Sequence, residues 1–437
     1  MANDSLIPPA DAKREFAVAV VRQLADAGYQ ALWAGGCVRD FLLGREPDDY
    51  DVATSARPEE VQKVFGPHRT RAIGASFGVI LVHGPRHGLG GDVEVATFRT
   101  EGPYLDGRRP EHVSFATPEE DAHRRDFTIN GMFYDPLSGQ VLDYVGGRED
   151  LAGKIVRAIG DPYARFTEDK LRMLRAVRIT ARFDFELDEK TAQAVRSQSH
   201  EMLVVSQERI AQELKKMLVH PRRTRAMQMA HDVQLLAVIL PELGPIMATA
   251  GRPVADDRWR TTLQMLERLD SPRFELALAA LLHELAFDAA ADEADVIAGQ
   301  ICRRLKLSND ECHDVTWLVG HCAALHGAAS WKKSRLKRLL AQSLIGELIS
   351  LERAHASATD VSLAGIEFCE RYLRTTPVDV INPPPLITGD DLKRMGIVPG
   401  PRFKELLELV RDAQLEDLIA TADEALELVR RSTGAPS

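Results

Sequence analysis

Apolar and polar positions follow two different periods along the chain, and the change falls near residue 160. Before it, short apolar or alternating runs are separated by Gly/Pro turns and brief helical stretches. These runs cover 31–34, 78–82, 93–98 and 141–144. Runs of this length, bounded by turn residues, are typical of strands. They predict a mixed α/β unit over 1–160.

The remainder of the chain carries a helical period. Leu171, Leu174 and Val177 recur every three residues, and Ile210 and Leu214 are four residues apart. The same spacing continues to about residue 370, and a proline-rich break precedes a last helical region. We therefore expect an α+β fold, with all-helical segments over 161–230, 231–370 and 371–437.

Composition narrows the class of protein. The chain has 437 residues, 45% of them hydrophobic, and 55 basic against 65 acidic side chains, a formal charge of −10. A disordered chain and a histone-like basic coat are both excluded. The five cysteines form no Cys-x-x-Cys pair, so a reducing compartment is expected. No secretion signal or apolar span of about 20 residues is present, which predicts a cytoplasmic protein away from membranes.

A glycine pair follows the first strand-like run. Gly35 and Gly36 precede a short helical pattern that contains Arg39. Backbone N–H groups at such a turn can bind an anion, and the planar guanidinium suits phosphate oxygens. The alternative is a tight strand-to-helix turn with no ligand.

Acidic residues lie in two of the strand-like runs. Asp49 and Asp51 are two apart and would share one face of a strand, where paired carboxylates need a cation. Glu94 lies among apolar residues of another run, where an unpaired charge is costly, and Asp92 competes with it for the same role. These acids predict a magnesium site.

Four motifs in order resemble one enzyme family. They are Gly-Gly-x-Val-Arg-Asp at 35–40, Asp-x-Asp at 49–51, Glu-Val-Ala-Thr-Phe-Arg at 94–99 and Arg-Arg-Asp-Phe-Thr-Ile-Asn at 124–130. This order is similar to that of class II tRNA nucleotidyltransferases (CCA-adding enzymes) and the related bacterial poly(A) polymerases. The resemblance implies a polymerase beta-like head at 1–160, a neck at 161–230, a body at 231–370 and a tail at 371–437.

The resemblance also implies an activity. CMP and AMP from CTP and ATP would be added to the tRNA 3′ end without a nucleic-acid template, with release of pyrophosphate and no obligatory protein partner. Asp49 and Asp51, with Glu94 as a third acid, would hold two Mg²⁺ ions. Arg125 and Asp126 would lie near the ribose and read its 2′-hydroxyl.

A further motif implies how the incoming base is chosen. The run from Glu168 to Arg175 matches the family's Glu-Asp-x-x-Arg-x-x-Arg helix. We expect Asp169 and Arg172 side by side on one helical face, with Glu168 orienting Arg172 from one turn away. A carboxylate accepts the amino group of cytosine or adenine and meets a carbonyl on uracil or guanine. Without the upstream motifs, this would be a surface ion pair.

Other segments carry weaker expectations. The run 101–110 is similar to the flexible loop of CCA- and A-adding enzymes. In the helix over 206–214, Ser206 is expected to cap and Arg209 to pair with Glu213. An acidic protein needs local basic surface to hold RNA. The candidates are Lys215, Lys216, Arg222, Arg223 and Arg225, and a second group of Lys332, Lys333, Arg335, Lys337 and Arg338 beside Trp331.

Two segments of the helical part contain residues of the types that bind metals. The run 278–284 resembles the helix of an HD phosphohydrolase, but His283-Glu284 stands where His-Asp is expected, which favours a structural helix. Cys312-His313 and His321-Cys322 could suggest zinc, but the apolar residues between them favour one buried helix. The alternatives left open are an A-adding enzyme or poly(A) polymerase, a catalytically silent RNA-binding protein, and a phosphohydrolase acting through His283.

Overall fold

The structure is a computed structural model that describes residues 12–74, 78–84, 91–101, 113–253, 257–287 and 293–433. Contacts divide the chain into two compact units, Met1–Pro241 and Glu242–Ser437. The finer division into head, neck, body and tail stays a prediction. Most of the run expected to form a loop over 101–110 lies outside the described residues.

A mixed seven-stranded sheet forms the centre of the first unit. Its order is β3 (Thr70–Gly74), β4 (Val79–His83), β5 (Asp92–Thr97), β2 (Asp51–Thr54), β1 (Ala31–Ala34), β8 (Phe133–Asp135) and β9 (Gln140–Leu142). Strands β2 and β5 pair in parallel, and the other neighbours pair antiparallel. The four strand-like runs of the sequence are therefore strands.

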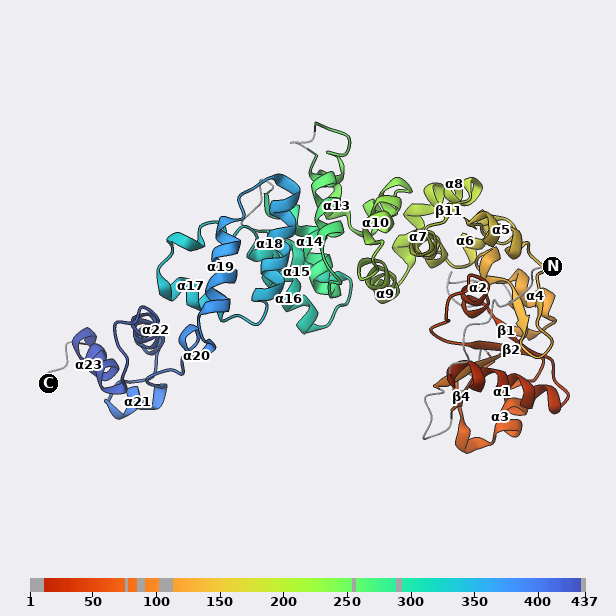
Figure 1. Ribbon diagram of the computed structural model, residues 1–437, viewed down its shortest axis with the longest axis horizontal. Helices are drawn as coiled ribbons and strands as arrows, with labels where there is room; N and C mark the ends of the chain where they lie inside the picture. The colour runs from red at the N-terminus through yellow and green to blue at the C-terminus, as the bar shows by residue number, and fades with distance from the viewer. Residues whose placement is uncertain are drawn as a thin grey trace. The chain divides into compact units, whose positions relative to one another are not determined.

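The two faces of this sheet are covered differently. Helices α1 (Ala12–Asp26) and α3 (Pro58–Phe65) contact the strands, and Trp33, Val52 and Val95 belong to the core shared with α1 (Figure 1). A smaller cluster that includes Ala34, Ala53, Phe98 and Phe133 contains Ala122 from α4 (Pro118–His123). Because strand side chains alternate, Asp51 and Glu94 project from this second face.

Helices follow the sheet in the first unit. They are α5 (Gly147–Gly153), α6 (Pro162–Glu168), α7 (Leu171–Phe183), α8 (Glu189–Gln198), α9 (Gln207–Leu218), α10 (Arg223–Asp232) and α11 (Leu235–Ile239). Helix α6 begins where the Asp161 carboxylate accepts the N–H groups of Tyr163 and Ala164, with proline at the first helical position. Helix α7 packs on α9 and α10, so the apolar period of the sequence marks its buried face.

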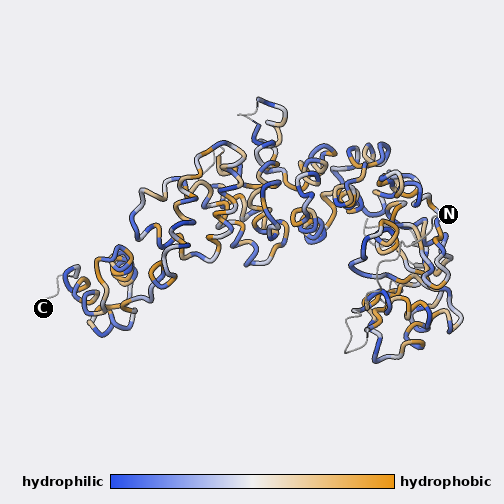
Figure 2. The backbone as a smooth tube through the Cα atoms, in the orientation of Figure 1, coloured by the Kyte–Doolittle hydropathy of each residue, from blue (hydrophilic) through white to orange (hydrophobic). Residues whose placement is uncertain are grey.

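The second unit is helical throughout its described part. Its main helices are α13 (Arg258–Arg268), α14 (Phe274–Leu282), α15 (Ala294–Arg304), α16 (Asn309–Gly320), α17 (Lys333–Leu340), α18 (Ile345–Thr359), α19 (Ala364–Thr375), α22 (Pro401–Leu415) and α23 (Ala422–Thr433). Helix α14 is buried almost all round, against α13, α16 and α18. Figure 2 shows hydrophobic positions alternating with hydrophilic ones along most helices, as the predicted period requires. Within the described ranges, no helix combines the length and apolar character needed to cross a membrane.

Candidate active site

Two of the three acids predicted to bind metal lie on neighbouring strands. Asp51 opens β2, and its register partner across the parallel ladder is Glu94 in the middle of β5. Residues paired in register project from the same face, so these two carboxylates are neighbours. Asp49 lies in the bend before β2. The expectation that one strand carries both aspartates is therefore wrong, because the strand starts two residues later.

The environment of Asp51 is electrostatically crowded. Burial of its carboxyl raises the pKa, Glu94 raises it further, Arg125 lowers it and Asp49 raises it, and the resulting value is about 6. A carboxylate whose neighbours are two further acids favours a bound cation. Within the described residues, these three acids are not among the groups whose ligand atoms all lie within 4.8 Å of one another.

The competing acid on β5 has a different partner. Asp92 pairs in register with His83 of β4, and His83 Nδ1 lies 3.1 Å from its Oδ1. Glu94 is therefore the acid of β5 that lies beside Asp51.

The glycine pair forms the predicted turn between β1 and α2 (Gly36–Leu42). Gly35 has a φ of 75°, which favours glycine, and a Cβ there would lie 3.0 Å from Arg125 Nη1. A Cβ at Gly36 would lie 3.5 Å from Arg39 Nη2. Both guanidinium groups therefore approach the backbone of the turn closely, and a side chain at Gly35 would displace Arg125.

Arg39 is more deeply buried than a residue that binds phosphate needs to be. The residue is 6% exposed, and its guanidinium donates to both oxygens of Asp40 and, at 2.7 Å, to Asn130 Oδ1. It also stacks 4.1 Å over the ring of Phe183 at the end of α7. Direct phosphate binding by Arg39 stays a prediction, while these contacts favour a role in joining α2 to the 124–130 segment and to α7.

The Arg-Arg-Asp segment is held by both local and long-range ion pairs. Arg125 donates to Asp121 and lies 4.9 Å over the ring of Phe133. The Asp126 carboxylate accepts two bonds from Arg175 of α7, at 2.9 and 2.5 Å, and one from Asn130. Burial opposes ionisation of Asp126, but Arg175 and Asn130 outweigh it and hold the pKa at about 2. No local motif indicates this pairing, because the two partners are 49 residues apart.

Replacing Arg175 by methionine should destabilise the first unit. The variant leaves the nearly buried Asp126 carboxylate without its main partner, a loss of about 2 kcal/mol once the partial exposure of Arg175 is allowed for. Asp126 has a lowered pKa, so the pair contributes above the unfolded pKa of about 4 and the contribution fades as pH falls towards 2. Urea unfolding at pH 7 measures the loss.

The matched control for this pair is Arg196→Met. Arg196 is more exposed and lies 3.7 Å from Glu189, a surface pair that should contribute less than about 0.5 kcal/mol. Equal losses in the two variants would contradict a special role for Arg175.

Asp169 and Arg172 do not lie on one helix. Helix α6 ends at Glu168, Asp169 is extended with φ −140° and ψ 104°, and α7 begins at Leu171. The expected i, i+3 geometry is therefore wrong at this junction. One Asp169 oxygen accepts the Leu171 N–H at 3.1 Å, and the other accepts Arg209 Nη2 at 2.7 Å.

The partners of the α9 residues also differ from expectation. Arg209 pairs with Asp169, whereas Glu213 accepts from Arg178 of α7, so the predicted Arg209–Glu213 pair is wrong. Ser206 occupies the N-cap position of α9 without a capping side-chain bond. Both ion pairs connect α9 to the α6–α7 segment, which a helical repeat within α9 cannot reveal.

Arg172 is fixed by three acceptors. Its Nη1 donates to Glu168 Oε2 at 2.6 Å and to the Arg165 carbonyl, and its Nη2 donates to the Arg124 carbonyl at 3.1 Å. The expected contact from Glu168 one turn away is present. The guanidinium therefore links α7 to the segment that carries Arg125 and Asp126.

The first group of basic residues proposed to hold RNA contains both exposed and buried side chains. Lys216 is exposed, and Arg222 pairs with Asp184 at 2.9 Å. Arg223 is 3% exposed and donates to the Leu218 carbonyl, so its expected place on the surface is wrong. Lys215 lies in the last turn of α9. The structure also has a hollow that the sequence does not predict. Basic residues of α7, of α9 and of the segment after α9 line it, among them Arg178, Arg182, Lys216, His220 and Arg222.

The second basic group is largely paired within its own unit. Lys333 and Lys337 both contact Asp417, and Arg338 contacts Glu408 and Asp412 of α22. Arg335 stacks 3.9 Å over the ring of Trp331. Most of the basic side chains expected to face RNA therefore form ion pairs with acids of this unit, and these pairs hold α17 against α22 and the residues that follow it.

Comparisons with known proteins agree with these motifs. Residues 31–157 match the family described as "Poly A polymerase head domain", and residues 184–247 match "Probable RNA and SrmB- binding site of polymerase A". A CCA-adding enzyme of Geobacillus sp. (strain WCH70) is 34% identical over 406 residues, 91% of each chain. The CCA-adding enzyme of Lactobacillus helveticus is 47% identical over 221 residues, which span 50% of this chain and 53% of that enzyme.

A solved structure shares the fold. The Bacillus stearothermophilus CCA-adding enzyme in complex with CTP superposes with a TM-score of 0.73 at 28% identity, covering 98% of this chain and 99% of that one. The motif order, the acid pair on β2 and β5 and the end-to-end similarity agree. The chain belongs to the CCA-adding enzyme family of tRNA nucleotidyltransferases.

Proposed function

We propose that this protein transfers CMP and AMP from CTP and ATP to the 3′ end of tRNA and so builds or repairs the CCA terminus. The observation that carries the proposal is the register pairing of Asp51 with Glu94 beside the Gly35–Gly36 turn. It occurs in a chain similar over nine-tenths of its length to a CCA-adding enzyme. Because its proposed substrate is tRNA, we expect the protein in the cytoplasm.

The cofactor that fits the acid cluster is Mg²⁺. Asp49 and Asp51 would hold it, with Glu94 as a third acid. Carboxylate oxygens suit a hard cation, and the negative charge of the acids around Asp51 favours a bound cation. Bound there, Mg²⁺ supplies Lewis-acid activation of the RNA 3′-hydroxyl and charge stabilisation of the departing pyrophosphate. The turn at Gly35 and Gly36 offers backbone N–H groups to the triphosphate.

The nucleotide would be oriented from the other side by the α6–α7 junction. Asp169 uses its two oxygens for Leu171 and Arg209, but a carboxylate has about four acceptor positions. Three hydrogen bonds fix Arg172. Asp169 can therefore accept the amino group of cytosine or adenine, while Arg172 donates to ring acceptors. Arg125 and Asp126 lie on the segment that Arg172 and Arg175 anchor, and we place them towards the ribose.

Activity should fall as pH drops through about 6. The Asp51 pKa of about 6 lies above its ordinary value, so the carboxylate gains a proton below that pH and loses affinity for a cation. Initial rates of AMP transfer at subsaturating Mg²⁺ between pH 5 and 8 test this. Excess Mg²⁺ should shift the falling limb to lower pH, because cation binding competes with the proton. A limb that Mg²⁺ does not move would assign it to another group.

Three substrates distinguish the activity from its alternatives. Transcripts of one tRNA ending before CCA, after C and after CC are each incubated with CTP, ATP, UTP or GTP. The proposal expects CTP to extend the first two and ATP to extend the third. Extension of the CC-ended tRNA alone would indicate an A-adding enzyme, and long tails on unrelated RNA a poly(A) polymerase. No transfer with any substrate would indicate a silent RNA-binding protein.

A further inference from the structure

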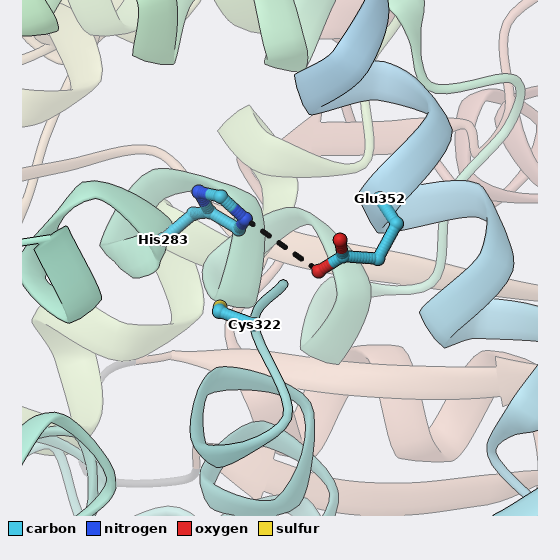
Figure 3. A group of neighbouring side chains, drawn as sticks. All are labelled: His283, Cys322 and Glu352. Atoms are coloured by element: carbon cyan, nitrogen blue, oxygen red, sulfur yellow. Dashed lines mark ion pairs between the residues drawn. The ribbon is translucent and has the colours of Figure 1, made fainter. Parts of the chain in front are cut away.

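A group of ionisable side chains, two of them buried and one partly exposed, lies in the second unit and contains none of the proposed active-site residues (Figure 3). His283 begins the 3₁₀ helix η7 (His283–Phe287), Cys322 follows α16, and Glu352 lies in α18. The side chains of His283 and Glu352 are 0% exposed. One ligand atom from each of the three residues lies within 4.8 Å of the other two.

Several polar atoms in this cluster lack partners. His283 Nε2 and Glu352 Oε2 are buried without a hydrogen bond, although Glu352 Oε1 accepts the Ala323 N–H at 2.6 Å. His283 Nε2 lies 3.9 Å from Glu352 Oε1, too far for a hydrogen bond. Buried polar atoms are nearly always satisfied, so the unpaired atoms of two facing residues indicate a missing ligand.

The other nitrogen of His283 has a carboxylate neighbour. His283 Nδ1 lies 3.4 Å from Glu284 Oε1, and Glu284 is 3.7 Å from His355 Nε2 and 3.5 Å from Arg258 Nε. Histidines that bind metal commonly donate their second N–H to a carboxylate, which fixes the ring and the tautomer. This arrangement leaves Nε2 to face Cys322 and Glu352.

We propose that His283 Nε2, Cys322 Sγ and a Glu352 oxygen bind one Zn²⁺ ion that ties η7, the end of α16 and α18 together. Thiolate, imidazole and carboxylate are the ligands of zinc, whereas Mg²⁺ takes oxygen ligands. His326 Nε2 lies 3.4 Å from Glu352 Oε2 but outside the group of three whose ligand atoms are all within 4.8 Å, so it would have to move to supply a fourth ligand. Cys322 and His326 are partly exposed, which gives the ion a path.

This site differs from the two metal patterns considered in the sequence. Of Cys312, His313, His321 and Cys322, Cys322 is the member that faces the cluster. His321 stacks on Trp317 and its Nδ1 lies 2.7 Å from the Trp317 carbonyl oxygen, and Cys312 neighbours Cys302. Helix α16 between them confirms the single-helix interpretation. The acid that faces His283 is Glu352, 69 positions further along the chain, which no local motif could indicate.

The rival account is a proton in place of a metal. Burial lowers the pKa of His283, but Cys322, Glu284 and Glu352 raise it overall, so an imidazolium could balance Glu352. The two accounts differ in metal content and in the response to Zn²⁺, and both are measurable on the full chain.

Cobalt provides the probe. The full-length protein is stripped with a chelator and titrated with Co²⁺, which substitutes for zinc and gives a sulfur-to-cobalt charge-transfer band only where a thiolate binds it. We expect one equivalent to produce the band and Zn²⁺ to displace it. Cys322→Ser should abolish the band and weaken Zn²⁺ binding at least tenfold, and Glu284→Gln should weaken it about tenfold to a hundredfold.

Cys312→Ser is the matched control, since Cys312 is also partly exposed but lies outside the cluster. It should keep the band. The active-site acids cannot mimic the signal, because they offer no sulfur.

Two results would overturn the proposal. The first is a wild-type chain with neither a charge-transfer band nor a rise in melting temperature on adding Zn²⁺, which would establish the proton account even if the variants fail to fold. The second is a band that survives Cys322→Ser and disappears in Cys312→Ser, which would move the metal to the Cys302–Cys312 pair.

Discussion

Asp51→Asn should lower AMP and CMP transfer by roughly a thousandfold. The substitution removes one of the two carboxylates that β2 and β5 bring into register. A bound cation stabilises the transition state by several kcal/mol, and each 1.4 kcal/mol changes the rate about tenfold. Single-turnover transfer of label from α-labelled ATP to a CC-ended tRNA measures the loss. The RNA affinity should stay unchanged, since the acid has no part in holding the tRNA body.

The same variant should be more stable than the wild type without metal. The folded-state pKa of Asp51 lies above its unfolded value, so its ionised form opposes folding above pH 6 and an uncharged amide does not. Although burial around the carboxyl raises the pKa of Asp51, the residue as a whole stays exposed to solvent, and this screening limits the gain to about 1 kcal/mol. Urea unfolding at pH 8 with EDTA separates this gain from a general loss of structure.

Asp92→Asn is the control on the same face of β5. Asp92 pairs with His83 rather than with Asp51, so its loss should reduce transfer less than tenfold. If Asp92→Asn were as inactive as Asp51→Asn, or if Asp51→Asn kept a tenth of the activity, the assignment of the metal acids would fail.

The head could be predicted from the sequence because its signals are local. The strands β1, β4 and β5 coincide with apolar runs, and the Gly35–Gly36 turn sits where the glycine pair follows a strand. In both cases the deciding interaction involves a strand period or a single turn, which a short stretch of residues determines. The pairing of Asp51 with Glu94 is different, because the parallel ladder joins residues 43 positions apart and the sequence leaves Asp92 as a competitor.

The long-range partners of several charged residues could not be predicted, because they are distant in sequence. Arg39 donates to Asn130 across 91 positions and Asp169 accepts from Arg209 across 40. A helical repeat offers only partners three or four residues away, so it predicts Glu213 as the partner of Arg209. A buried charge is unfavourable unless it is paired. A buried charged side chain therefore pairs with the opposite charge that the packing of α7 against α9 brings near it.

These distant pairs bear on the proposed function because they hold together the segments that would orient the nucleotide. Arg172 reaches the Arg124 carbonyl and Arg175 reaches Asp126, so α7 is bonded twice to the segment beside the glycine turn. Arg39 adds a third link through Phe183. A site for base selection supported in this way can keep its geometry while the RNA end changes, as untemplated addition of different nucleotides requires.

Asp169→Asn should therefore weaken the discrimination between CTP and UTP by about tenfold to a hundredfold. In the proposed site the carboxylate would accept the cytosine amino group and oppose the uracil carbonyl, whereas an amide could donate to that carbonyl. One such base contact contributes about 1–3 kcal/mol. The ratio of kcat/KM for CTP and UTP, measured on a tRNA lacking CCA, gives the change. A carbonyl oxygen in Asn can still accept the Leu171 N–H, so α7 should keep its start.

The control for this change lies at the opposite end of α6. Asp161 caps the helix, and asparagine caps about as well, so Asp161→Asn should leave both stability and the CTP-to-UTP ratio unchanged. Arg209→Met removes the ion pair on the far oxygen of Asp169 and should lower kcat/KM for CTP and ATP together, because it loosens the acid without changing its chemistry. If Asp169→Asn left the ratio intact while Arg172→Met altered it, the arginine alone would read the base and the acid would serve only to join α9 to the junction.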